Sequence, residues 1–151
     1  MPPERALVIG ILDAFQAAER AGAQALGCWL ATCGDPALRG GLRVIRARDE
    51  RHAALAEARL RALGGVPGAG ISRELAALCS LVADPSVSDR SKLGLLVACF
   101  PAHDSTPLAE LGPRLEGDDE TRTLLETIGE DEQASLEWLR RMRDARERDG
   151  A

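Results

Sequence analysis

The chain lacks the sequence signals of β-strands, of membrane spans and of a nucleic-acid-binding face. Tyrosine is absent and aromatic residues make up only 3%, and the β-branched residues never alternate with polar ones as a half-buried strand requires. No apolar run approaches the roughly 20 residues that cross a bilayer. The formal charge of -5 disfavours nucleic-acid binding, which normally depends on clustered Lys and Arg. We therefore expect no membrane and no nucleic acid among its partners.

The first residues also lack a basic stretch followed by an apolar core, which is the pattern of a secretory signal. We therefore expect a cytoplasmic protein whose four cysteines are reduced thiols. Cys28 and Cys33 do not have zinc-site spacing, and Cys79 and Cys99 lie in apolar segments. All four are interpreted as small core residues.

Alanine, leucine and helical spacing dominate what is present. The 151 residues, 45% of them hydrophobic, fit a single domain covering 1-151. The pattern predicts an all-α, antiparallel four-helix bundle with a broken third helix and a short extra helix before the last one. The predicted segments run from about Glu4 to Leu30, Pro36 to Leu63, Ser72 to Asp84, Ser88 to Phe100, Pro107 to Leu111 and Asp118 to Arg146.

Acidic residues interrupt the apolar stripes of the three longest predicted helices. Glu19 lies in the middle of the first stripe, Asp49 and His52 lie one turn apart on the second, and Glu132 lies within the last. A buried carboxylate is normally neutralised, paired or bound to a metal. The three acids lie at comparable depths, so an antiparallel bundle brings them and His52 to one level. This arrangement predicts a metal site.

The three segments resemble the motifs of the ferritin-like superfamily of di-iron carboxylate proteins. Its pattern is a Glu on the first and third helices and Glu-x-x-His on the second and fourth. Glu19, the Asp49-Glu50-Arg51-His52 stretch and the segment from Asp131 to Ser135 look like three of these motifs. The resemblance implies a ferritin-like bundle, iron as the cofactor, with manganese or zinc as alternatives, and a homo-oligomer such as a dimer.

Two departures from the family pattern reduce the expected site. Asp49 replaces a Glu, and Ser135 stands where the second histidine would be, which leaves an open or replaced ligand position. For the third-helix carboxylate, Glu74 comes too early along its helix and Asp84 directly precedes a proline, where a capping residue is more usual. Glu74 and Asp84 are therefore weak candidates. The remaining set of Glu19, Asp49, His52 and Glu132 suits one metal ion or a poorly filled pair.

Two classes of function remain open. The first is a metal-binding or oxidoreductase-like protein that uses the reduced carboxylate and histidine site. The second is a metal-free scaffold that acts through oligomerisation or an unidentified protein partner, its carboxylates satisfied by His52, Ser135 and water. Lys92 is expected on the solvent side of its helix, unless it is buried against a stripe carboxylate as part of that second alternative.

Overall fold

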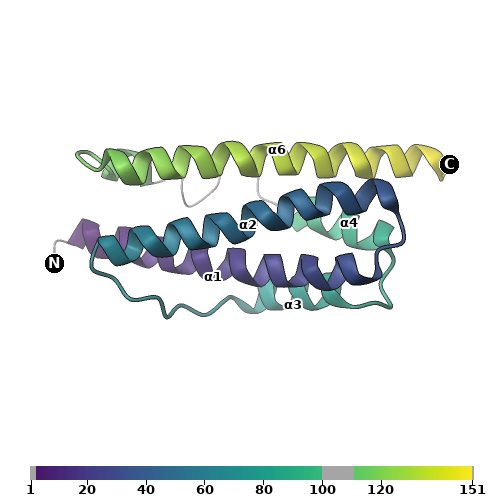
Figure 1. The fold of residues 1–151 in the computed structure, drawn as a ribbon, viewed down its shortest axis with the longest axis horizontal. Helices are drawn as coiled ribbons and strands as arrows, with labels where there is room; N and C mark the ends of the chain where they lie inside the picture. The colour runs from purple at the N-terminus through teal and green to yellow at the C-terminus, as the bar shows by residue number, and fades with distance from the viewer. Residues whose placement is uncertain (1–2, 100–110, 151) are drawn as a thin grey trace.

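The computed structural model describes residues 3-99 and 111-150, and these ranges are entirely helical apart from turns and connectors (Figure 1). Five α-helices and one 3-10 turn are present, and no strand occurs within the described ranges. This confirms the all-α prediction. The elements are α1 (Pro3–Thr32), α2 (Pro36–Ala62), α3 (Arg73–Ala83), α4 (Asp89–Cys99), η2 (Gly112–Arg114) and α6 (Asp119–Asp149).

Helices α1 and α2 form an antiparallel hairpin, and they share the most extensive contact between any two elements (Figure 1). The tight turn between them follows from its residues. The Asp35 side chain accepts a hydrogen bond of 2.9 Å from the Ala37 N–H, and Pro36 occupies the first helical turn, where its missing N–H costs nothing. The predicted cap at Asp35 is confirmed.

The predicted broken third helix consists of two separate helices that pack mainly against different partners. Helix α3 packs against α1, and α4 packs against α6 (Figure 1). Asp84 ends α3 with an extended backbone at ψ 117°, as the steric demand of Pro85 requires. Its carboxylate accepts hydrogen bonds from the N–H and hydroxyl of Ser86. The predicted short helix at Pro107 to Leu111 lies outside the described residues except for Leu111.

Lys92 is buried, whereas the sequence predicted it on the solvent side of its helix. Its side chain is 1% exposed, and its ammonium lies 5.8 Å from the centroid of the Trp29 ring. The buried side chain lies in the core, where the cation–π contact and the charge of Asp84 partly compensate for its own charge. Asp89, one turn earlier, accepts a 2.8 Å hydrogen bond from the Trp29 indole N–H.

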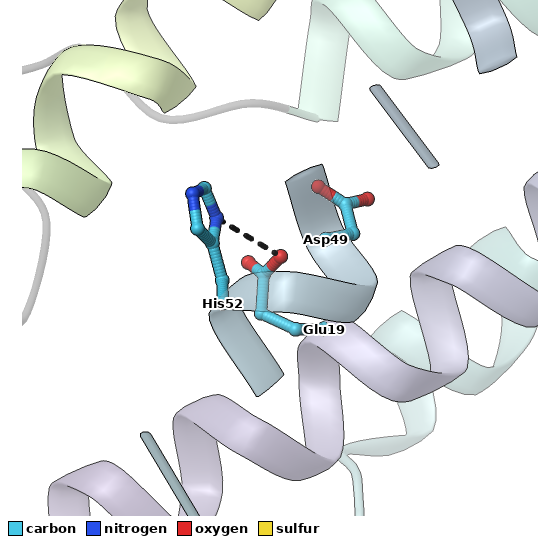
Figure 2. Close-up of side chains that lie close together, drawn as sticks. All are labelled: Glu19, Asp49 and His52. Carbon is cyan, nitrogen blue, oxygen red and sulfur yellow. Dashed lines mark ion pairs between the residues drawn. The ribbon is translucent and has the colours of Figure 1, made fainter. Parts of the chain in front are cut away.

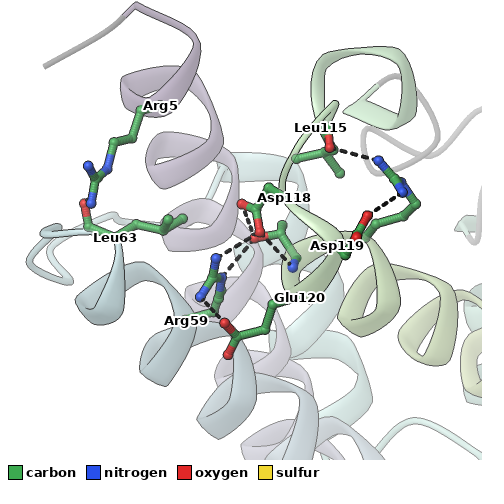
Figure 3. A network of polar contacts seen from close by, with 9 residues as sticks. Arg5, Arg59, Leu63, Leu115, Asp118, Asp119 and Glu120 are labelled. Carbon is green, nitrogen blue, oxygen red and sulfur yellow. Dashed lines mark hydrogen bonds and ion pairs between the residues drawn. The ribbon is translucent and has the colours of Figure 1, made fainter.

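Two anchors fix the register of α2 against α6. At one end, the Arg59 guanidinium donates to Thr121 Oγ1 at 2.8 Å and to Asp118 Oδ1 at 2.7 Å, at the start of α6 (Figure 3). At the other end, Arg146 near the end of α6 is paired with Asp35 at the start of α2. The two helices are therefore held antiparallel along most of their lengths.

This register brings the middle of both helices to one level. Asp49 lies fourteen residues after Asp35, and Glu132 lies fourteen residues before Arg146, the ion-pair partner of Asp35. At the other anchor, Asp49 precedes Arg59 by ten residues and Asp131 follows Thr121 by ten. Ten residues correspond to about 15 Å along a helix. The depth match that the sequence predicts thus has a structural cause in the two ion-paired ends.

The hydrophobic core is divided into two clusters, one on each side of that level. The first includes Trp29, Leu38 and Leu139, and the second includes Leu12 and Leu60. Between them each of the three long helices presents polar residues inward. Among the described residues, no helix is long and apolar enough to cross a membrane. The polar layer between the clusters is where the predicted site residues lie.

Candidate metal centre

Glu19 on α1 and Asp49 and His52 on α2 form a compact cluster of ligand atoms. One atom from each side chain can be chosen so that all three lie within 4.8 Å of one another. Figure 2 shows the Glu19 carboxylate directed at the imidazole, with Glu19 Oε2 at 3.7 Å from His52 Nδ1. The structure therefore brings together three of the residues predicted from the stripes.

Asp131 on α6 holds the far side of the His52 ring. Its Oδ2 lies 2.9 Å from His52 Nε2. An ionised carboxylate can only accept a hydrogen bond, so Nε2 carries the proton and donates it to Asp131. In the neutral ring this leaves the lone pair of Nδ1 facing Glu19, which is the form that binds a metal. Asp131 thus orients His52 for binding.

Asp131 lies in the last-helix motif, but no role was predicted for it from the sequence, although a signal was present. Asp131 precedes Ser135 by four residues, a spacing that places both side chains on one face of α6. Glu132 lies within the apolar stripe of α6, and Asp131 is its immediate neighbour in the sequence. In the structure both residues serve the same layer, Glu132 at the cavity beside Glu19 and Asp131 at the outer nitrogen of His52.

The carboxylates of the cluster are buried close to one another, and this raises their proton affinity. Burial, together with the charge and the hydrogen bond of Glu132, raises the pKa of Glu19 to about 8. Burial and, after it, the charge of Glu19 together raise the pKa of Asp49 to about 9. Without a bound cation, both groups are therefore largely protonated at neutral pH.

Two buried atoms of the cluster have no hydrogen-bond partner among the described residues. They are Glu19 Oε2 and His52 Nδ1, the pair that faces across 3.7 Å. His52 is 1% exposed, so its orphaned nitrogen is held inside the protein and directed at the acids. A buried polar atom normally has a partner. A cation that accepts both lone pairs would satisfy the oxygen and the nitrogen together, so this donor set fits a metal ion.

Ser135 occupies the position that the ferritin-like pattern assigns to a second histidine. It is buried and lines the same cavity as the cluster. Its Oγ accepts a 3.0 Å hydrogen bond from Arg48 Nη1. Sequence reasoning did not identify Arg48, whose side chain reaches across from α2 to α6. A guanidinium thus places a permanent positive charge on the side of the layer where Ser135 lies.

The two weak candidates lie elsewhere. Glu74 is exposed in the first turn of α3, and Asp84 ends the same helix, bound to Ser86. Neither is among the residues that line the cavity beside the cluster. Neither acid therefore supplies the third-helix carboxylate of the ferritin-like pattern.

Comparisons with protein-family models, with curated proteins and with solved structures find no match to this chain. The relation to the ferritin-like superfamily accordingly stays a prediction based on the residues described above. The chemistry of the site rests on its own geometry: two carboxylates and one imidazole converging in a buried layer, with a third carboxylate beside them.

Proposed function

We propose that this protein binds one divalent metal ion through Glu19, Asp49 and His52, with Glu132 as an additional carboxylate, in a ferritin-like bundle. The observation that carries the proposal is the facing pair of orphaned buried atoms, Glu19 Oε2 and His52 Nδ1. Carboxylate and imidazole ligands together suit iron, manganese or zinc. We favour iron on the resemblance to the ferritin-like pattern, with the other two as alternatives.

A single ion is favoured over a pair by the charges around the layer. Ser135 contributes a hydroxyl rather than an imidazole, and Arg48 beside it carries a positive charge. A second cation on that side would be repelled by the guanidinium and would have fewer ligands. On this account Arg48 compensates part of the negative charge that a second metal would otherwise neutralise.

The chain's own residues define what the site does. Asp131 fixes the imidazole, and burial keeps the carboxylates poised to exchange protons for a cation, since a metal requires its ligands deprotonated. A bound metal ion would supply Lewis acidity and, in the case of iron or manganese, redox chemistry. We propose an oxidoreductase-like role on this basis.

The metal-free scaffold is the weaker alternative. That alternative predicts carboxylates satisfied by hydrogen bonds to His52, Ser135 and water. In the structure His52 bonds to Asp131, and Ser135 accepts from Arg48, while the separation of Glu19 Oε2 from His52 Nδ1 exceeds a hydrogen bond. The homodimer expected from the resemblance and any protein partner stay predictions.

A manganese titration followed by electron paramagnetic resonance tests the proposal, because bound and free Mn²⁺ give distinct signals. We expect one ion per chain, nitrogen coupling from one imidazole, and tighter binding as the pH rises from 6 to 8. His52→Ala should remove the nitrogen coupling and weaken binding, whereas Glu130→Gln, an exposed neighbour on α6, should change neither. Mn²⁺ binding that is equally tight in His52→Ala would refute the proposed ligand set.

A further inference from the structure

A cavity of about 230 Å³ adjoins the carboxylate and histidine cluster. The acids and His52 occupy one wall, contributed by α1, α2 and α6. The opposite wall comes from α3 and α4 and is apolar, consisting of Leu75, Leu78, Cys79, Val82, Leu96 and Cys99. The cavity therefore has one polar end and a long apolar side.

We propose that this cavity binds a small neutral aliphatic molecule whose single polar head group lies at the Glu19 and His52 end. The hydrocarbon part would lie against the wall formed by α3 and α4. This molecule would bind with or without a metal ion. Only a reaction at its head group rests on the proposed metal site. The inference therefore assigns a substrate class to that site.

The lining residues disfavour an anionic head group and a planar aromatic ring. Among the described residues that line the cavity, none is Lys or Arg, and the Arg48 guanidinium outside it is already bound to Ser135. An anionic head group would therefore lie beside carboxylates with no lining counter-charge. No Phe, Tyr or Trp lines it in the described part of the chain either, so stacking does not favour a planar ring over a flexible chain. A flexible aliphatic chain matches leucine, valine and cysteine walls through apolar contact alone.

The volume sets the size of the ligand. A dry engineered cavity of about 150 Å³ holds benzene, and pockets for drug-sized ligands begin at about 300 Å³. The 230 Å³ cavity lies between these limits. The cavity therefore fits a medium-chain molecule, and its volume should limit the chain length of the ligand.

Leu75 provides a way to block the cavity, and Leu81 provides a matched control. Leu75 is a half-buried lining residue of α3, whereas Leu81 lies on the same helix, is 41% exposed and does not line the cavity. Replacing either leucine with tryptophan adds the same volume to α3. Only Leu75→Trp places that volume at the proposed binding wall.

Isothermal titration calorimetry of chelator-treated protein with 1-butanol, 1-hexanol and 1-octanol tests the inference. We expect one site per chain whose affinity increases about fourfold for each added methylene until the chain outgrows the cavity. Leu75→Trp should weaken octanol binding at least tenfold, and Leu81→Trp should leave it unchanged, with helical circular dichroism retained in both. The chain-length series on the unmodified protein decides the matter even if Leu75→Trp does not fold.

Three results would overturn the inference: no saturable binding, no dependence on chain length, or octylamine or octanoate binding as tightly as octanol. The outcomes for the two proposals are distinguishable because this titration contains no metal. Alcohol binding without Mn²⁺ binding would remove the metal centre and keep the pocket. Mn²⁺ binding without alcohol binding would do the reverse.

Discussion

Replacing Glu19 with glutamine should stabilise the metal-free protein, and the gain should grow with pH. The carboxyl group has an ordinary pKa of 4.5 in the unfolded chain and about 8 in the folded protein, because it is buried beside Glu132 and Asp49. Folding therefore holds a proton that the unfolded chain releases. The stability associated with this proton is fully present below pH 4.5 and is lost as the pH rises towards 8.

The size of the effect follows from the same two values. At pH 7 the unfolded chain has ionised Glu19 while the folded protein has kept its proton, a difference of about 3 kcal/mol. At pH 5 the difference is below about 1 kcal/mol. Glutamine has nearly the same shape and never ionises, so Glu19→Gln should recover about 3 kcal/mol at pH 7 and far less at pH 5.

Urea denaturation of chelator-treated protein at pH 5, 6, 7 and 8 measures this difference. Other shifted groups do not interfere in this window. Four carboxylates have a lowered pKa, and their contribution to stability is lost only when the pH falls below about 4: Asp13, Asp35, Asp84 and Asp118. The pKa values of the Cys33 and Cys79 thiols are raised from 9.0, which lies above this window. Asp49 acts in the same direction as Glu19 and remains in both proteins.

Exposed Glu130 on α6 supplies the control, because Glu130→Gln removes the same charge without a buried environment. It should change stability by less than about 0.5 kcal/mol at every pH. If Glu19→Gln had the same effect at pH 5 and pH 8, or destabilised the metal-free protein at pH 8, the account of the buried carboxylates would be wrong.

Two further substitutions test the layer and its register. Asp131→Asn should lower metal affinity by about 10- to 100-fold at unchanged stoichiometry, because it removes the charge that orients His52; a Mn²⁺ titration showing wild-type affinity would contradict this role. Gly41→Ala should destabilise the fold by about 1–3 kcal/mol, because the new methyl group would overlap the Trp138 ring at the α2–α6 contact. Gly40→Ala, whose methyl group meets open space, should instead be neutral or stabilising by up to about 1 kcal/mol in urea melts.

Much of the fold follows from local sequence signals. Asp35 and Asp118 accept hydrogen bonds at the starts of their helices, and Pro85 ends the element before it, as their residue types predict. The sequence could not show that the broken third helix would divide between two faces, one half on α1 and the other on α6. That choice depends on tertiary packing, which periodicity does not encode.

The cluster of Glu19, Asp49 and His52 was predictable because an acid within an apolar stripe is rare and three stripes repeat it. The roles of Asp131 and Arg48 were not predicted, because each reaches its partner from the edge of a stripe by the length and direction of its side chain. Lys92 was misplaced for a similar reason. A long aliphatic chain lets a charged residue occupy the core when an aromatic face and acids receive its end.

The most direct measurement of the central claim is elemental analysis of protein purified without chelator or a histidine tag, from cells supplied with iron, manganese and zinc. We predict close to one metal ion per chain, and near-complete loss of that metal in His52→Ala and Glu19→Gln but not in Glu130→Gln. Absence of metal, persisting after anaerobic incubation with ferrous iron, or a metal content unaffected by the two site variants, would contradict the account.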